Sequence, residues 1–340
     1  MALVYDTGFE EFSNQADLLK DGWASISGGV TISTATFRPG GHSARAYQNA
    51  TSNAVSYTLP SNSTTWYLEF AALTTSGANM AVMQMRDGSS QQNSIVFNVA
   101  TGKVQLRRGD HNGTVLAEST NVFSLGGNWF DLAVKAVTSN STGAAYLVYV
   151  NGNLEISYAS GNDTANTANS YANAVGFGSA SGGNVFIDDL VISDSALLLT
   201  RPHVVYLLPD GNGNESDFVG SDGNSTNNYD LVNDTLIQST NYTQSGTVND
   251  NDLYTLANLG YTPDVIHAVT VSNYLWKNGA GARQLRNLIR TGGVDYESAI
   301  INPSATPIIY NTNYELNPGT AAAWTPTEVN ALEIGVNVES

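Results

Sequence analysis

The chain has no cysteine, few basic residues and no long apolar run. The absence of cysteine excludes disulfides, thiolate zinc sites and a cysteine nucleophile, and it leaves the redox compartment undetermined. Lys and Arg total 13 against 30 Asp and Glu, which gives the 340 residues a formal net charge of −17. Because this charge opposes attraction to phosphate backbones and anionic membranes, we expect neither a nucleic-acid partner nor insertion into a membrane.

Two kinds of hydrophobic segment are also missing. No run reaches membrane-spanning length, and residues 1–12 lack the basic region and the continuous apolar core of a signal peptide. We therefore expect a soluble protein that is made in the cytoplasm. Charged residues make up only 13% of the chain, so its loops depend on neutral polar groups, which suits an extracellular or particle-borne β protein. A chain of 340 residues favours two compact domains.

The first half reads as an all-β sandwich. Residues 3–193 contain short β-rich runs separated by turn residues. Asn151-Gly152 joins two of these runs and predicts a type I′ hairpin. Residues 182–193 form an extended run with apolar side chains on both faces, and alternation places Asp188 and Asp189 on opposite faces. A strand of this kind lies inside a sandwich, and we expect it to close the first domain.

Four features of residues 3–195 together resemble the concanavalin A-like lectin/glucanase (LamG-like) jelly roll. They are an opening Gly8-Phe-Glu-Glu-Phe12 followed by Asp21-Gly-Trp23, a long middle ladder, the Tyr149-Val-Asn-Gly152 hairpin, and a closing Phe186-Ile-Asp-Asp-Leu190. The resemblance implies that an N-terminal strand pairs near the closing strand. It also implies that Glu10 or Glu11 lies close to Asp188 and Asp189.

Several carbohydrate-binding modules of similar shape hold a structural calcium between such elements. The resemblance therefore makes Glu10, Asp188 and Asp189 the candidate ligands of a structural calcium, an ion that prefers carboxylate and other oxygen ligands. The alternative is that these acids face solvent or pair with Arg38 or Arg45.

A lectin needs exposed aromatic side chains for stacking against sugar rings. Trp66, Tyr67 and Tyr171 are the candidates for carbohydrate binding, with the alternative that they belong to the core, as most aromatic residues of a sandwich do. A glycan hydrolase needs two carboxylates a few ångströms apart, usually at alternate positions of one strand. Residues 66–73 carry only Glu69, and no Glu-x-Asp-x-x-Glu run occurs. We therefore expect no catalytic residues and no enzymatic activity.

The second half, residues 199–340, reads as a separate β-rich domain after the first domain at residues 1–198. Extended segments are predicted at residues 204–208, 229–237, 254–259, 265–276, 282–290 and 299–310, with a helix as the alternative for 282–290. A turn is predicted at residues 209–213. One short helix is predicted near the C-terminus, with Thr325 as N-cap, Pro326 at the first position, Glu328 completing a capping box, and Gly335 at a left-handed exit.

The only concentration of basic residues in this acidic chain lies in the second half. Arg283, Arg286 and Arg290 follow Lys277 within a few residues. They are candidates for an interface with an acidic neighbour. The alternative is that they pair with local carboxylates on a solvated face, as long basic side chains commonly do.

Ordered short motifs in residues 200–340 resemble the closing domain of structural proteins in tailed-phage virions. They are Val265-Ile-His-Ala-Val-Thr-Val271, Gly281-Ala-Arg-Gln-Leu285, Leu288-Ile-Arg-Thr-Gly-Gly293 and the run from Ala323 to Val336. This resemblance implies a virion component on the head or tail exterior, such as a capsid decoration protein or a tail-associated protein, synthesised in the host cytoplasm.

The expected partners follow from that placement. They are other virion proteins, such as the major capsid or tail proteins, and further copies of the chain, with a trimer among the states that particle symmetry favours. The alternative function is a carbohydrate-binding adhesin that contacts a host surface glycan. Lectin folds also serve purely structural contacts, so the fold cannot decide between the structural and the adhesin function. A glycan hydrolase is the third and least favoured function.

Overall fold

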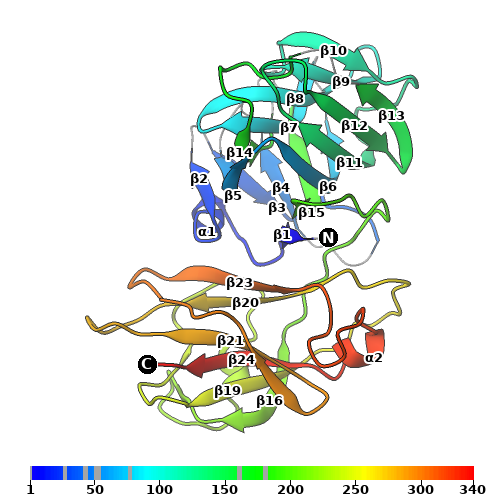
Figure 1. The fold of residues 1–340 in the computed structure, drawn as a ribbon. Coiled ribbons are helices and arrows are strands. Elements are labelled where there is room, and N and C mark those ends of the chain that lie inside the picture. Colours follow the sequence, from blue (N-terminus) through cyan, green and yellow to red (C-terminus); the bar gives the residue numbers. More distant parts are fainter. Residues whose placement is uncertain are drawn as a thin grey trace. The chain divides into compact units, whose positions relative to one another are not determined.

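The computed structural model describes residues 2–25, 29–40, 45–49, 55–75, 79–158, 163–178 and 183–340. The chain divides into two compact units, Met1–Val204 and Val205–Ser340, which we call unit 1 and unit 2. Both units consist mainly of antiparallel β-strands (Figure 1), so the predicted all-β class is confirmed. None of the helices in the described part of the chain is long and apolar enough to cross a membrane.

Unit 1 is a jelly-roll sandwich of two antiparallel sheets, which we call sheet A and sheet B. In spatial order, the described strands of sheet A are β13 (Asn153–Tyr158), β12 (Ala145–Val150), β11 (Trp129–Val137), β6 (Thr65–Thr74), β15 (Val185–Ser193), β4 (Ala46–Asn49) and β3 (Val30–Ser33), and β1 (Leu3–Thr7) also pairs with β15. Those of sheet B are β10 (Thr114–Glu118), β9 (Lys103–Arg108), β8 (Ser90–Asn98), β7 (Asn79–Asp87), β14 (Ala172–Gly176), β5 (Val55–Ser63) and β2 (Trp23–Ser25).

The two ends of unit 1 meet in sheet A. Strand β1 runs antiparallel to β15, with Leu3 opposite Ser193 and Thr7 opposite Leu190. Every residue of β15 is buried, as its apolar residues on both faces predict. The predicted hairpin joins β12 to β13, and Asn151 and Gly152 have φ angles of 50° and 84°, the left-handed values that a type I′ turn requires. Gly182, in the predicted closing run, lies outside the described residues.

The core of unit 1 lies between the two sheets, and its contacts identify the inward face of each strand. Phe97 on β8 and Phe130 on β11 pack edge to face, with ring centroids 5.8 Å apart. Trp66 on β6 is 1% exposed, and its Nε1 donates to the Ala172 carbonyl on β14 at 3.0 Å. Because side chains alternate along a strand, Tyr67 and Glu69 lie on the outer face of sheet A.

A short helix that the sequence did not reveal follows β1. Helix α1 (Gln15–Leu18) starts at Asn14, whose side chain accepts a hydrogen bond from the Ala16 backbone. Leu18 is buried, so this single turn covers one edge of the core.

Unit 2 is built on a five-stranded sheet, sheet C, and all of its residues are described. The order of sheet C is β16 (Pro209–Ser216), β19 (Asn251–Leu256), β24 (Glu333–Val338), β21 (Leu285–Thr291) and β22 (Val294–Glu297). The remaining elements are the pair β17 (Val219–Gly220) and β18 (Thr243–Gln244), the pair β20 (Val269–Leu275) and β23 (Ile308–Tyr314), the 3-10 turn η1 (Asn228–Leu231) and the helix α2 (Pro326–Val329).

Three predictions of strands and turns in unit 2 were wrong. Residues 204–208 form no strand, and the predicted turn at residues 209–213 instead belongs to β16. Pro209 is tolerated there because it is the first residue of an edge strand. Residues 229–237 hold the turn η1 and no strand. By contrast, residues 282–290 contribute to β21, so the helical alternative is excluded.

The short C-terminal helix forms as predicted, but its end differs. Thr325 caps α2, Pro326 is in its first turn, and the reciprocal bonds of a capping box join Thr325 and Glu328. The predicted left-handed exit at Gly335 is wrong, because Gly335 is a residue of β24. A Cβ atom at Gly335 would lie 1.8 Å from the Asp252 carbonyl oxygen, so glycine is needed for the close approach of two strands.

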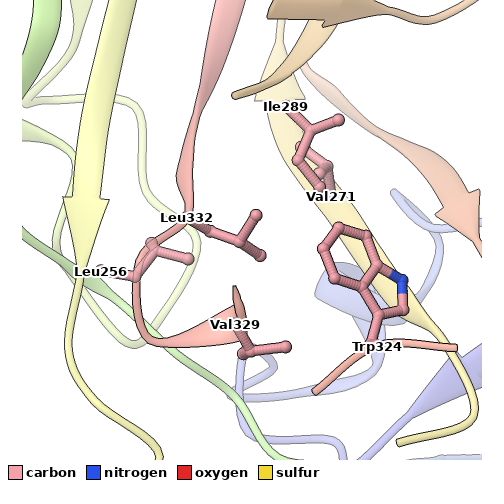
Figure 2. Close-up of a cluster of buried hydrophobic side chains, with 6 residues drawn as sticks. All are labelled: Leu256, Val271, Ile289, Trp324, Val329 and Leu332. Carbon is pink, nitrogen blue, oxygen red and sulfur yellow. The ribbon is translucent and has the colours of Figure 1, made fainter. Parts of the chain in front are cut away.

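The main core cluster of unit 2 lies between sheet C, β20 and the segment around α2. Figure 2 shows its six buried residues: Leu256, Val271, Ile289, Trp324, Val329 and Leu332. Trp324 is the largest, and its Nε1 donates to the Tyr314 carbonyl at 2.7 Å. A smaller cluster contains Phe218, Val336 and Val338.

Candidate functional site: a charged hollow on sheet A

The outer face of sheet A carries a row of half-buried residues across its central strands. Lys135 on β11 pairs with Tyr67 on one side and with Leu147 on the other. In the next row, Ala133 pairs with Glu69 and with Tyr149. Directly paired residues share a face, so Tyr67 and Tyr149 both lie on this outer surface.

A bulge in β15 brings two adjacent carboxylates to this face. The pairing of β15 with β6 shifts between Asp188 and Val191, and Asp189 has a φ of 51°. A bulge redirects side chains and breaks strict alternation. The backbone N–H of Arg38 donates to Asp188 Oδ2 at 2.8 Å, while the Arg38 guanidinium donates to Asp189 Oδ2 at 2.6 Å. The expectation of opposite faces for the two aspartates is therefore corrected by the bulge.

Arg38 is the centre of an ion-pair network. Its side chain is 8% exposed, and it contacts the carboxylates of Asp189 on β15 and Asp131 on β11. Arg201 Nε binds the other oxygen of Asp131 at 2.5 Å. His203 Nδ1 lies 3.1 Å from Asp189 Oδ2. One guanidinium thus links two strands of sheet A that are separated by β6.

Residues 198–204, which we call the strap, are fixed across this face by backbone bonds. Glu69 accepts hydrogen bonds from the backbone N–H groups of Leu198 and Leu199. Val204 N donates to Asp189 Oδ1 at 2.8 Å, and the Pro202 carbonyl accepts from Arg38. The domain boundary was expected after residue 198, whereas the strap belongs to unit 1 through these contacts.

A small open hollow lies between the strap and the sheet. Its lining includes Arg38, Asp131, Ala133, Gly152, Leu199 and Arg201. It has room for about one water molecule in its present form, so it is a polar notch rather than a deep pocket. The notch adjoins the exposed end of the β12–β13 hairpin, because Gly152 forms part of its wall.

Burial decides the protonation of the carboxylates beneath the strap. The pKa of Asp188 is raised to about 8, first by burial and then by the negative charges of Asp189 and Glu10, against the backbone hydrogen bonds from Arg38 and Asp189. The pKa of Glu69 is also raised by burial, and the two strap N–H groups counter that shift.

Two of the predicted calcium ligands, Glu10 and Asp188, are near enough for their charges to interact. The charge of Glu10 acts on Asp188, and Glu10 Oε1 accepts a hydrogen bond from Arg45 N at 3.3 Å. Asp189 is instead paired with Arg38, which is the alternative stated from the sequence. Within the described ranges, no group of three or more His, Cys, Asp or Glu side chains could hold a metal ion. Calcium binding by these residues stays a prediction.

The three predicted carbohydrate-binding residues lie in different places. Trp66 is in the core and is not available to a sugar. Tyr67 is half-buried on the outer face of sheet A. Tyr171, just before β14, is half-buried, and its hydroxyl accepts from Asn169 Nδ2 at 3.1 Å. Only Tyr67 therefore shares a face with the charged notch.

The basic residues of unit 2 follow the alternative of local pairing. Arg286 binds both carboxylate oxygens of Glu339, at 2.9 and 3.2 Å, and Arg290 binds Asp295 at 2.7 Å. Arg283 is exposed, and its side chain bonds the Ala282 carbonyl. The pKa of Arg286 and that of Arg290 are raised by these carboxylate bonds. An interface role for the three arginines stays a prediction.

Sheet B has polar side chains on its outer face that make a different arrangement. Arg86 and Gln84 on β7 share this face and bond to each other at 3.0 Å, and Arg107 on β9 bonds Gln105. All four side chains are at most 7% exposed. Burial lowers the pKa of Arg86 to about 10. Because these groups have almost no accessible surface, we assign them to stability rather than to ligand binding.

Sequence reasoning missed Asp131, Arg201 and His203. Each is an isolated charged or titratable residue without a motif, and they meet only because the strap crosses β11 and β15. The Arg201-Pro202 dipeptide indicates that the chain turns there, but it does not indicate which residues the turn contacts.

No protein-family model matches the sequence, and no curated protein does. Solved structures similar to this chain include a cellulose-induced protein (13% identity, 59% of this chain, 99% of that chain, TM-score 0.39). A carbohydrate-binding module from Bacillus subtilis is similar at 10% identity (51% and 96%, TM-score 0.33), and domain 4 of an extracellular arabinanase from Geobacillus stearothermophilus at 17% (59% and 96%, TM-score 0.37). Similarity at these sequence identities and TM-scores supports no conclusion about function.

Proposed function

We propose that this protein is a structural component of a tailed-bacteriophage virion that acts through protein–protein contacts and catalyses no reaction. The observation that carries the proposal is where the virion-like motifs lie in unit 2. The first, third and last motifs supply residues to the main cluster of unit 2: Val271, Ile289, Trp324, Val329 and Leu332 (Figure 2). In the smaller cluster, Val336 comes from the last motif, and Leu285 from the second motif packs against it. The motifs therefore contribute to the same packed unit, which supports reading them together.

In this proposal unit 2 attaches the chain to the particle, and unit 1 is displayed on the head or tail exterior. Attachment by unit 2 is favoured because its motifs carry the resemblance to virion proteins. The partners are a major capsid or tail protein, and the chain assembles as a homo-oligomer.

Mass spectrometry of gradient-purified virions tests this placement. Peptides from both units should co-purify with the major capsid protein at a constant ratio across the particle peak, while a host cytoplasmic protein used as a control should not. A Trp324→Ala variant, which removes the largest side chain of the unit 2 cluster, should be lost from the particles. If the wild-type chain is absent from purified particles, the proposal fails.

A second function is favoured by the outer face of sheet A: binding of a host surface glycan. Half-buried Tyr67 and Tyr149 flank Lys135 and the charged notch, so ring faces and hydrogen-bonding groups lie on one surface. Sugar recognition uses such a combination of aromatic and polar side chains. In this proposal, glycan binding complements the virion role, because an exposed module is placed to contact the host.

A glycan array probed with the full chain tests the second function. Tyr149→Ala should reduce binding at least tenfold, whereas Tyr171→Ala is the matched control because Tyr171 is also half-buried but lies away from this face. Equal losses in the two variants, or no binding by the wild type in repeated arrays, would eliminate glycan binding by sheet A while leaving the virion role intact.

A further inference from the structure

Lys135, in the middle of β11, differs from every other basic residue of this acidic chain. The described ranges include all 13 lysines and arginines, and within them the Lys135 ammonium alone forms no hydrogen bond or ion pair. The other lysines bind a carboxylate or backbone carbonyls. Lys135 is nevertheless half-buried on the outer face of sheet A. A cation that is partly removed from water without a partner adds no ion pair to the fold, so its charge is available to a ligand.

Two tyrosines lie next to Lys135. Tyr67 on β6 and Leu147 on β12 are its direct cross-strand partners, and Tyr149 lies diagonally from it, one row further along β12. Both tyrosines are half-buried, and in the described residues neither phenol hydroxyl forms a hydrogen bond. The ammonium therefore lies beside aromatic side chains whose polar ends are also unused.

A second cation lies further along the same face. The side chain of Arg201, on the strap, is 55% exposed, and its Nε binds Asp131, while in the described part of the chain its two terminal nitrogens form no hydrogen bond. Asp131 precedes Lys135 by four residues on β11, and a rise of about 3.3 Å per residue separates them by about 13 Å. Tyr149 belongs to the row between them, opposite Ala133. A cation, an aromatic ring and a second cation therefore follow one another along these strands.

The acidic residues beside this row are already bound within unit 1. Glu69, diagonal to Lys135, is 4% exposed, and its oxygens accept hydrogen bonds from strap N–H groups. Asp131 is shared by Arg38 and Arg201. Because neither carboxylate pairs with Lys135, the face has room at this position for a negative charge that a ligand supplies.

The position of this row on central strands favours a glycan over an acidic peptide. An extended peptide gains affinity by adding a strand to the free edge of a sheet. Strand β11 has no free edge, because it is hydrogen-bonded to β12 on one side and to β6 on the other. A ligand that lies here reaches side chains only. Sugar rings suit such a surface, because they combine apolar faces for an aromatic ring with polar substituents for the cations.

We propose that the outer face of sheet A binds an acidic glycan. The Lys135 ammonium and the Arg201 guanidinium contact its anionic groups, which are carboxylates, sulfates or phosphates, and Tyr149 stacks on a sugar ring between them. This assignment rests on the glycan-binding function proposed above and specifies the charge of the ligand. Because the net charge of −17 opposes general attraction to polyanions, binding depends on these two local cations.

Binding of the full chain to matched pairs of polysaccharides tests the charge preference. The members of each pair differ only in charge: a polyuronate and its methyl ester, a sulfated galactan and its desulfated form, and a phosphorylated mannan and its dephosphorylated form. We expect binding that is at least about tenfold tighter to the acidic member of one or more pairs, and the responding pair identifies the anionic group. Added salt should weaken binding to the acidic member and leave binding to the neutral member nearly unchanged.

Exchanges of the two cations locate the charge contacts. Lys135→Met should weaken binding to the acidic member about tenfold, because a bond to a charged group is lost, and should leave the neutral member unaffected. Lys135→Arg keeps the charge and should retain binding, and Arg201→Gln should reproduce the selective loss. Tyr149→Ala should weaken binding to both members alike.

Lys103→Met is the matched control for Lys135→Met. Lys103 is also a half-buried lysine of unit 1, but it lies on β9 of sheet B, where its ammonium donates to two backbone carbonyls. This variant changes the net charge by the same amount and should bind the acidic member as the wild type does. Because the Lys135 ammonium bonds no described residue, its variants should fold, and hydrogen exchange of unit 1 peptides checks this.

Failure of the acidic ligand and failure of glycan binding give different results. Equal affinity for the acidic and neutral members of every pair would overturn the acidic ligand and leave glycan binding intact. So would a Lys135→Met variant that binds the acidic member as tightly as the wild type, or a loss of the same size in Lys103→Met. If the wild type binds neither member of any pair, glycan binding by sheet A fails, and the acidic ligand fails with it.

Discussion

Asp189 in unit 1 and Asp252 in unit 2 are both fully buried carboxylates on strands, yet their surroundings differ. Asp189 is bound by the Arg38 guanidinium, by His203 and by a strap N–H group. Asp252 is surrounded by neutral donors. The difference shows two surroundings for a buried carboxylate in a highly acidic chain. Unit 1 uses one of its few arginines, whereas unit 2 surrounds Asp252 with neutral hydrogen-bond donors, and burial raises its pKa.

The largest effect is expected from breaking the unit 1 pair. Arg38→Met leaves Asp189 buried without its guanidinium, so the free energy of unfolding should fall by about 3–5 kcal/mol. Denaturant unfolding, with hydrogen exchange of unit 1 peptides, measures the change. The double variant Arg38→Met with Asp189→Asn should recover most of the loss, because both partners are then removed. A single variant as stable as the wild type would contradict a charge-balancing role for Arg38.

A smaller loss is expected from the corresponding change in unit 2. Asn228→Ala removes the donor to the Phe218 carbonyl and to Asp252, and it should cost about 2 kcal/mol because buried acceptors are left unpaired. The same hydrogen-exchange experiment on unit 2 peptides measures it. The comparison between units would lose its basis if this loss equalled that of Arg38→Met in size.

The next largest effect is the change in the stability of unit 1 with pH. The pKa of Asp188 in the folded state is about 8, above the value of about 3.9 for an unfolded chain. The native state therefore holds a proton that the unfolded state releases, so the stability from this group is complete below about pH 4 and is lost as pH rises toward 8. We expect a loss of at least about 1.4 kcal/mol, the equivalent of one pKa unit.

Thermal unfolding of the full chain between pH 5 and pH 8, with peptide-resolved exchange, checks this slope. Asp188→Asn keeps an acceptor for Arg38 N and cannot ionise, so its unit 1 midpoint should change less with pH than that of the wild type. A wild-type midpoint that rises with pH across this range would mean that Asp188 is ionised in the folded protein.

The smallest effect is expected at the surface of unit 2. Arg290 and Asp295 form an ion pair 2.7 Å long between adjacent strands, with both side chains partly exposed. Arg290→Gln should lower the free energy of unfolding by less than about 1 kcal/mol, and the effect should shrink with added salt. Urea unfolding at low and high salt measures it. A loss comparable to that of Arg38→Met would remove the distinction between buried and surface pairs.

The sequence predicted those parts of the fold that depend on local patterns. The type I′ hairpin at Asn151-Gly152 formed because both residues tolerate left-handed φ angles, and the capping box at Thr325 formed because its bonds are local. The pairing of β1 with β15 came from a resemblance, and the structure confirms it. Gly335 was misread because a glycine that permits close strand packing looks the same in sequence as one that ends a helix.

The candidate sites were less accessible to sequence reasoning. Tyr67 was identified among aromatic residues, but its exposure, and the burial of the adjacent Trp66, depend on which face of β6 meets sheet B. Asp188 and Asp189 were noticed as a pair, but their common partner depends on a bulge. The buried pair of Asp252 and Asn228 carried no signal, because the two residues lie 24 positions apart in a polar stretch.

Composition and local pattern were enough to establish an acidic, cysteine-free, all-β chain with two halves, because charge, turn chemistry and strand periodicity are properties of short stretches. The tertiary structure alone decided which charges are buried and what compensates them. Arg38 reaches Asp189 across 151 positions, and the strap reaches Glu69 across 129. Electrostatic compensation depends on distance in space and on burial, and neither quantity is contained in the order of the residues.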